Sequence, residues 1–179
     1  MSLRCDVRTV LTGWTAPDDA QATLRDGYVA FVDDHEDAVL RACVPGHLTA
    51  SALVVSPDRA RVLLTLHPKV GLWLQMGGHL EPGDATLRDA AAREALEESG
   101  IAGLAVGASP VRLDRHRVTC HGGSDHLDVQ YVAVAPPDAV HVMSEESLDL
   151  AWFDVDALPV LTDDALRHLV AAALALPFH

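Results

Sequence analysis

The sequence has no long hydrophobic run. No segment approaches the roughly 18 consecutive apolar residues that a membrane-spanning helix requires. The N-terminal segment MSLRCDVRTVLTGW also lacks the apolar stretch of a secretory signal peptide. These absences predict a cytoplasmic protein that does not associate with membranes.

Cysteine is scarce. The chain has three cysteines, Cys5, Cys43 and Cys120, which are widely spaced and form no Cys-x-x-Cys pair. The odd number argues against a disulfide framework, and the spacing argues against a cysteine-based zinc site. We therefore expect a reducing compartment, which agrees with a cytoplasmic location.

Basic residues are also few. Lysine and arginine number 13 against 26 aspartates and glutamates, so the net charge is −13. Nucleic-acid binding depends on basic side chains that neutralise phosphates, so a nucleic-acid partner is not expected. A small phosphorylated substrate would need the local field reversed, and a bound divalent cation would do this. Most of the acidic side chains are expected to act only as solubilising surface groups.

The length of 179 residues fits one domain with a sizeable core and a short N-terminal addition. Residues 1–15 show no clear pattern. Elsewhere, apolar periodicity and turn residues predict helices within 18–41, strands over 47–55 and 61–66 joined as a hairpin, a helix over 85–99, strands over 109–115, 127–135 and 148–154, and a helix over 163–176. This order indicates an α+β fold or a mixed-sheet α/β sandwich. Residues 1–45 would form a helical extension packed on a domain of residues 46–179.

The helix predicted over 85–99 carries the most informative pattern. One arc holds Ala91, Ala92, Ala95 and Leu96, and an adjoining arc holds three glutamates, Glu94, Glu97 and Glu98, at spacings i, i+3 and i+4. Like charges at these spacings destabilise an isolated helix by a few tenths of a kcal/mol per pair. A solvated acidic face, partly offset by an Arg93–Glu97 pair, is one interpretation.

The other interpretation is a metal site. Mg²⁺ takes oxygen ligands and leaves coordination positions for water and substrate phosphates. The loop before the helix, GGHLEPGD, has glycines that allow backbone groups to approach a ligand closely. Gly100 stands where a helix C-terminal glycine is expected.

The segment from Gly77 to Ile101 resembles the box of the Nudix (MutT-like) hydrolase family. The family pattern is Gly-x5-Glu-x7-Arg-Glu-apolar-x-Glu-Glu-x-Gly-apolar, and residues 93–101, REALEESGI, match every fixed position of its second half. The first half departs from the pattern. Asp84 replaces the usual glutamate, eight residues rather than seven separate it from Arg93, and Met76 precedes the glycines where proline is frequent. Asp84 could absorb the extra residue as the helix N-cap.

The resemblance implies a Nudix-type α/β/α sandwich with a catalytic loop and helix. It implies that Glu94, Glu97, Glu98 and the Gly77 carbonyl hold Mg²⁺ or Mn²⁺, that Glu94 helps to activate water, and that Arg93 orients the glutamates. The expected reaction is attack of water on a diphosphate bond in a nucleoside diphosphate linked to another moiety. A homodimer is compatible with the resemblance.

Residues outside the segment from Arg93 to Ile101 give weaker predictions for substrate binding. The candidates for substrate binding are Gly78, Trp73, His126 and Asp128. His126 and Asp128 are two residues apart on one strand and so face the same side. Acidic residues beyond the helix are candidates for a further metal ligand or base: Asp128, Asp125, Glu145 and Glu146. His126, His116 and His121 form a local histidine group that could bind a metal. Aromatic residues could stack on a base, and a polar turn could reach phosphates: Trp73, Tyr131, Trp152 and Phe153; His67 and Lys69. Ordinary surface, hydrogen-bonding or core-packing roles are the alternatives for all of them.

Two other functions remain to be considered. A catalytically silent Nudix-fold nucleotide-binding or sensor domain would be marked by the loss of box glutamates, and all three are present. An isomerase of an isoprenoid diphosphate on the same fold would require a catalytic cysteine, and neither Cys43 nor Cys120 has a suitable sequence context. The sequence therefore favours hydrolysis.

Overall fold

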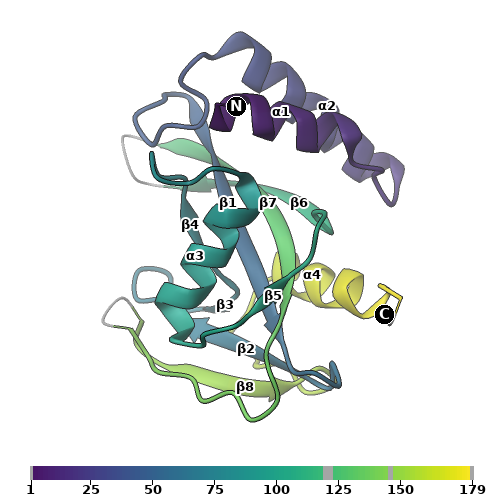
Figure 1. Ribbon diagram of the computed structural model, residues 1–179, viewed down its shortest axis with the longest axis vertical. Coiled ribbons are helices and arrows are strands. Elements are labelled where there is room, and N and C mark those ends of the chain that lie inside the picture. The colour runs from purple at the N-terminus through teal and green to yellow at the C-terminus, as the bar shows by residue number, and fades with distance from the viewer. Residues whose placement is uncertain (1, 119–122, 145–146, 178–179) are drawn as a thin grey trace.

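The computed structural model describes residues 2–118, 123–144 and 147–177. Four helices and eight strands are found in these residues (Figure 1). In chain order they are α1 (Leu3–Gly13), α2 (Asp19–Asp34), β1 (Gly46–Val55), β2 (Arg61–Leu66), β3 (Trp73–Leu74), β4 (Met76–His79), α3 (Leu87–Ser99), β5 (Ala105–Val106), β6 (Arg112–Val118), β7 (Ser124–Val134), β8 (Leu150–Asp154) and α4 (Asp164–Leu174). None of these helices has both the length and the apolar character needed to cross a bilayer.

One mixed sheet organises the molecule. Its centre is the parallel pair β1 and β7, which are aligned over ten residues from Gly46↔Asp125 to Val55↔Val134. β2 and β4 pair with β1 in antiparallel fashion, and β5 and β6 pair with β7 in the same way. β3 and β8 extend the sheet from β2. The predicted hairpin of β1 and β2 is confirmed.

Helices cover both faces of the sheet, as the resemblance implied. Buried residues of α1, α2 and α3 pack against one face, where β1 contributes Leu48, Ala50, Ala52 and Val54. Buried residues of α4 pack against the other face, where β1 contributes Leu53 and Val55. The alternation follows from the two-residue period of a strand. The fold is therefore the predicted α/β/α sandwich.

The N-terminal residues form a helical pair at one end of the molecule (Figure 1), where α2 contacts β6 and α1 contacts α3. The helix α1 is an addition to the predicted elements, and α2 runs unbroken through Gly27. The Gln21 side chain bonds the backbone amide and carbonyl of Leu113 at 2.7 and 3.0 Å, and the Tyr28 hydroxyl donates to the Asp114 carbonyl at 2.6 Å. These buried bonds fix α2 on the sheet.

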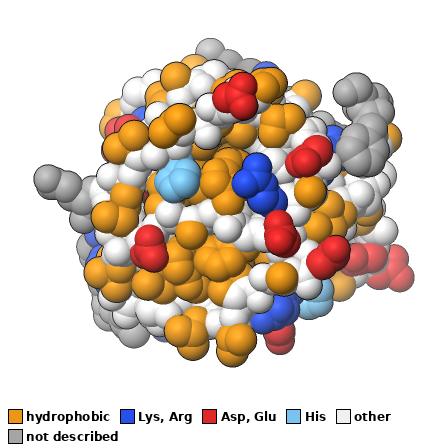
Figure 2. Space-filling model, turned by 90° about the horizontal axis from the view of Figure 1, so that it is seen from below, with side chains coloured by type: hydrophobic (Ala, Val, Ile, Leu, Met, Phe, Trp, Pro, Cys, Tyr) orange, Lys and Arg blue, Asp and Glu red, His pale blue; other side chains and the backbone are white. Residues whose placement is uncertain are grey.

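Figure 2 shows how side chains of different kinds are distributed on one face of the molecule. On the face seen from below, hydrophobic side chains gather near the centre and acidic side chains lie around them (Figure 2). The described exposed apolar residues come largely from the segments after β7 and β8, including Val140, Val142, Leu148 and Val160.

Candidate active site

The helix α3 carries the predicted carboxylates and packs closely on the sheet. Its N-cap is Thr86, whose hydroxyl accepts a hydrogen bond from the Asp89 amide at 3.1 Å. Small buried side chains, among them Ala90, Ala91 and Ala95, allow the helix to approach β1 and β7 closely. Leu96 is 47% exposed, so its predicted place in the apolar arc is wrong. The buried stripe instead centres on Leu87, Ala91 and Ala95.

The end of α3 is fixed by glycine, as predicted. Gly100 has a φ of 66°, which lies in the left-handed region that a side chain disfavours, and its amide donates to the Leu96 carbonyl at 2.8 Å. The Val142 amide then donates to the Ser99 carbonyl at 2.7 Å. This contact brings the segment before β8 to the end of the helix that carries the glutamates.

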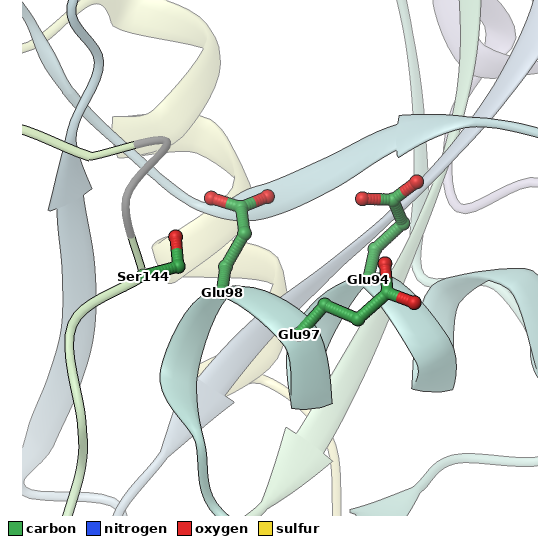
Figure 3. Close-up of a pocket in the computed structure, with 4 residues that line it drawn as sticks. All are labelled: Glu94, Glu97, Glu98 and Ser144. Atoms are coloured by element: carbon green, nitrogen blue, oxygen red, sulfur yellow. The ribbon is translucent and has the colours of Figure 1, made fainter.

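The three glutamates lie together at the surface of α3. Glu94, Glu97 and Glu98 line a pocket with Ser144, and their side chains project on the same side of the helix (Figure 3). Glu98 and Ser144 face each other across this pocket (Figure 3). The structure therefore brings together the three residues predicted as metal ligands, and it adds Ser144, which has no sequence pattern to mark it.

The strand β4 brings the two box glycines against these carboxylates. A Cβ atom at Gly78 would lie 2.6 Å from one carboxylate oxygen of Glu94, so a side chain at that position would displace Glu94. The Gly77 amide donates to the Glu98 carboxylate at 2.9 Å. The glycines thus allow backbone to reach the carboxylates, and the proposed role of the Gly77 carbonyl stays a prediction.

Arg93 connects the loop to the helix. Its guanidinium donates to both carboxylate oxygens of Asp84 at 3.0 Å, to Glu94 at 2.9 Å and to Glu97 at 3.1 Å. It also donates to the His79 carbonyl at 3.0 Å. The hydrogen bonds with Asp84, followed by those with Glu94, raise the pKa of Arg93 despite its partial burial. This geometry fits the orienting role that the resemblance implies.

The variant residue Asp84 is a partner of Arg93 and not the N-cap of α3. Thr86 occupies the cap, so the suggestion that Asp84 absorbs the extra residue there is wrong. The extra residue lies before the helix, where Asp84 also accepts from the Glu81 amide at 2.7 Å. Burial opposes ionisation of Asp84, but the hydrogen bonds from Arg93 and the Glu81 amide outweigh it, and the net effect lowers its pKa.

A residue from the N-terminal helix also supports α3. The buried carboxylate of Asp6 in α1 accepts a hydrogen bond from the Leu87 amide at 2.8 Å. This amide is in the first turn of α3, where backbone N–H groups lack partners within the helix. Sequence patterns could not identify the contact, because Asp6 and Leu87 are 81 positions apart.

Two predicted substrate-binding residues, His126 and Asp128, lie on the opposite face of the sheet from α3. Their neighbours Leu127 and Val129 belong to the core that α3 covers. Asp128 is 4% exposed, so the alternative of a surface carboxylate is wrong for it. It accepts hydrogen bonds from Thr49 at 2.9 Å and Ser51 at 2.6 Å, and burial raises its pKa. The structure does not bring His126 or Asp128 to the carboxylate pocket.

The aromatic candidates pack within the protein. Trp73 lies edge-to-face with Phe153, with ring centroids 4.8 Å apart, in the core under α4. Tyr131 is buried on the opposite face, and Trp152 lies under the guanidinium of Arg61 at 5.5 Å. Of the predicted substrate-binding residues, Gly78 alone adjoins the glutamates.

The remaining candidates have local partners or lie outside the described residues. The Lys69 amide donates to His67 at 3.2 Å, as in an ordinary polar turn. Asp125 pairs with Arg115 at 2.7 Å and with Arg117 at 3.3 Å. Three candidates and one cysteine lie outside the described residues: His121, Glu145, Glu146 and Cys120.

The donor set at α3 suits a hard divalent cation. Three carboxylates on adjoining positions of one helix supply anionic oxygen ligands, and a chain with a net charge of −13 has few cations of its own to neutralise them. Arg93 neutralises only part of this charge. The residues present therefore fit Mg²⁺ or Mn²⁺.

Comparison with known proteins agrees with this site and fold. The sequence model of the NUDIX domain matches residues 45–173. The chain is similar in structure to a NUDIX-family hydrolase from Clostridium perfringens, with 23% identity, a TM-score of 0.60, and coverage of 74% of this chain and 97% of that chain. It is also similar to a C. elegans Ap4A hydrolase, with 20% identity, a TM-score of 0.58, and coverage of 72% and 95%.

A third similar structure is the NUDIX domain of Shewanella oneidensis NrtR complexed with ADP ribose, with 19% identity, a TM-score of 0.56, and coverage of 75% and 90%. The search of curated proteins found no match. The solved structures show the shared fold, and the domain match extends over most of the chain. On these grounds the chain belongs to the Nudix family.

Proposed function

We propose that this protein is a divalent-metal-dependent pyrophosphohydrolase that cleaves a diphosphate bond in a nucleoside diphosphate linked to another moiety. The observation that carries the proposal is the assembly of Glu94, Glu97 and Glu98 around one pocket beside the glycines of β4. Hydrolysis of this bond needs positioning and charge stabilisation more than covalent chemistry.

The three glutamates would hold the cation. When bound, Mg²⁺ or Mn²⁺ would polarise phosphoryl oxygens and lower the pKa of water. Glu94 would accept a proton from the attacking water, as the family resemblance implies, and Gly78 lets its carboxylate lie close to the backbone of β4. Arg93 would keep Glu94 and Glu97 in place through its bonds at 2.9 and 3.1 Å, and Gly77 would hold Glu98 through its amide.

The names of two similar structures support the substrate class. One is a hydrolase of Ap4A and the other was solved with ADP ribose, and both compounds contain a nucleoside joined through phosphates to a second group. Among the described residues, three carboxylates and Ser144 line the pocket on α3, so a bound cation would be needed to hold the phosphates there. We therefore place the diphosphate at this pocket and leave the choice among such compounds to experiment.

A substrate panel tests the proposal. The full chain would be incubated with dinucleoside polyphosphates, ADP-ribose, nucleotide sugars and nucleoside triphosphates, with Mg²⁺, with Mn²⁺ or with chelator. Phosphate would be measured after phosphatase treatment for the compounds whose phosphates are blocked at both ends, and after treatment with inorganic pyrophosphatase for the nucleoside triphosphates. We expect release that depends on the metal. Glu97→Gln should lower turnover roughly 100-fold or more, on the scale of other lost transition-state contacts. The matched control Glu36→Gln changes an exposed glutamate that is far from Glu97 in the sequence. This variant should keep full turnover.

The panel also separates hydrolysis from binding alone. A catalytically silent domain would bind one of these compounds without releasing products in any metal. Full activity in a variant that lacks both Glu97 and Glu98 would overturn the assigned role of the carboxylates.

A further inference from the structure

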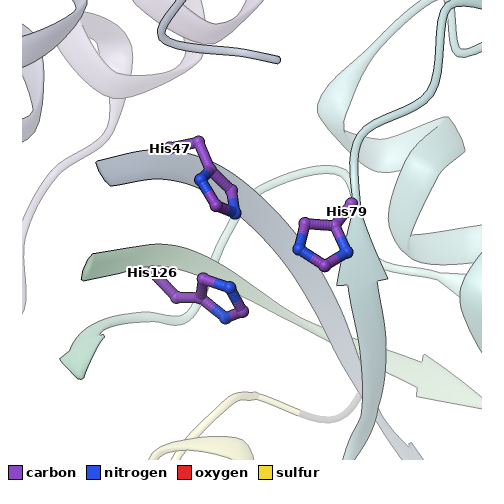
Figure 4. A group of neighbouring side chains, drawn as sticks. All are labelled: His47, His79 and His126. Carbon is purple, nitrogen blue, oxygen red and sulfur yellow. The ribbon is translucent and has the colours of Figure 1, made fainter. Parts of the chain in front are cut away.

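A second group of potential metal ligands lies on the sheet, apart from the glutamates. His47 of β1, His79 of β4 and His126 of β7 each place a ring nitrogen within 4.8 Å of the others. Figure 4 shows the three rings turned toward one another from three strands. Their ring centroids are 5.0, 4.8 and 5.1 Å apart, which makes an almost equilateral triangle.

Strand register explains why these residues meet. His47 and His126 are direct partners in the parallel pair of β1 and β7. His79 pairs opposite Thr49, two residues from His47 on the same face of the sheet. This face is opposite the one on which Gly78 contacts Glu94. The histidines and the glutamates therefore lie on opposite faces of the sheet at β4.

We propose that His47, His79 and His126 form a site for a borderline transition-metal ion such as Zn²⁺, separate from the carboxylate site. Imidazole nitrogens suit Zn²⁺, whereas Mg²⁺ prefers oxygen ligands. Three protein ligands with water in the fourth position form a common tetrahedral arrangement. In that arrangement the nitrogens lie about 3.3 Å apart, as follows from Zn–N bonds of about 2.0–2.1 Å. The ring nitrogens already lie within 4.8 Å of one another, so metal binding would require the rings to move closer together.

Burial supports metal binding by neutral imidazoles. His47 is fully buried, and His79 and His126 are partly exposed, so an ion could enter from their side. The ring of His126 lies against the rings of both other histidines. Its Nε2 atom is buried and makes no hydrogen bond with the described residues. Buried polar atoms normally have a partner, and a metal ion would supply one.

The surroundings contain groups that could support the ligands. His116 lies beside His126, with ring centroids 5.3 Å apart, and bonds the Asp114 carboxylate at 2.8 Å. Asp128 follows two residues after His126 on the same face and is held by Thr49 and Ser51. Outer groups of this kind orient the imidazole ligands of a metal. The site would join β4, which carries the box glycines, to the two central strands.

Zinc titration of the full chain tests the site directly. Chelator-treated protein would be titrated calorimetrically with Zn²⁺ in a large excess of Mg²⁺, which occupies oxygen sites. We expect one equivalent of tightly bound Zn²⁺, and a visible Co²⁺ spectrum with the intensity of tetrahedral coordination. Wild-type protein that binds no Zn²⁺ under these conditions, or whose bound Co²⁺ gives only a weak octahedral spectrum, would overturn the proposal.

Variants assign the ligands. His79→Gln and His126→Gln, at the partly exposed positions, should weaken Zn²⁺ binding beyond the roughly 10–100-fold seen when an outer partner is lost. Two control variants should still bind one equivalent of Zn²⁺. They are His168→Ala, on an exposed residue of α4, and the double variant Glu97→Gln/Glu98→Gln. The opposite pattern, with loss in the glutamate variant and retention in the histidine variants, would assign the ion to the pocket on α3. Failure of hydrolysis in the substrate panel would leave this binding result unchanged.

Discussion

Replacement of Asp84 by alanine should destabilise the protein by about 2–3 kcal/mol. Asp84 accepts two charge-assisted hydrogen bonds from Arg93, both 3.0 Å long, and one from the Glu81 amide at 2.7 Å. Each bond to a charged group contributes about 1.5–3 kcal/mol, but the three bonds are not additive. Arg93 would keep its other acceptors, and its side chain is 20% exposed, so water would replace part of the loss. The value should therefore fall below the 3–5 kcal/mol typical of breaking a fully buried pair.

Urea unfolding at neutral pH measures this effect. The midpoint should fall with an unchanged m-value, since the folded state keeps its compactness. Asp156→Ala, on an exposed aspartate for which the described residues show no side-chain hydrogen bond, should stay within about 0.5 kcal/mol of wild type. Turnover of Asp84→Ala should also fall, because Arg93 holds Glu94 and Glu97. Equal stability of Asp84→Ala and the Asp156→Ala control would refute the reasoning.

Three further predictions test other contacts of the site. Gly78→Ala should lower kcat at least tenfold with little loss of stability, because its Cβ would lie 2.6 Å from the Glu94 carboxylate and displace that side chain. Steady-state kinetics would measure kcat, and thermal unfolding followed by circular dichroism would measure the stability. Asp6→Ala should lower the free energy of unfolding by about 1–2 kcal/mol, the usual effect of losing a cap at a helix start, and a thermal melt that matched wild type would contradict it. The lowered pKa of Asp84 means that the unfolded chain binds its proton more readily. The stability that Asp84 contributes should be complete well above its unfolded pKa of about 3.9 and decline as pH falls through its lower folded pKa, and urea midpoints of wild type and Asp84→Asn should converge there.

The local parts of the site could be predicted from the sequence. Glu94, Glu97 and Glu98 are set by the helical period alone, and Gly100 ends the helix because of a conformation that the residue type favours. The strands β1 and β2 follow from apolar runs separated by a turn. In these cases the structure depends on neighbours within about one helical turn or one hairpin.

The parts that depend on long-range contacts could not be predicted. The helix α1 has Leu3, Val7 and Leu11 at helical spacing, yet a helix this short is stable mainly because of the core it packs against. Proximity in the sequence groups His126 with His116 and His121. Its neighbours His47 and His79 come from strands whose pairing only the sheet reveals. The eight residues between Asp84 and Arg93 indicate a variant loop. They do not reveal that the Asp84 carboxylate accepts hydrogen bonds from Arg93.

The parallel pairing of β1 and β7 also has a consequence for how the chain folds. Polar residues of β1 stand opposite polar residues of β7, as in His47↔His126, Thr49↔Asp128 and Ser51↔Gln130. A shift of one residue in the register of β7 would turn its polar groups toward the apolar core beneath α3. The row of polar residues therefore favours one register of the two strands. The pairing also joins segments 79 residues apart. Ribosomal synthesis must therefore pass residue 134 before the centre of the sheet can close, and the first half of the chain must wait for its partner strand.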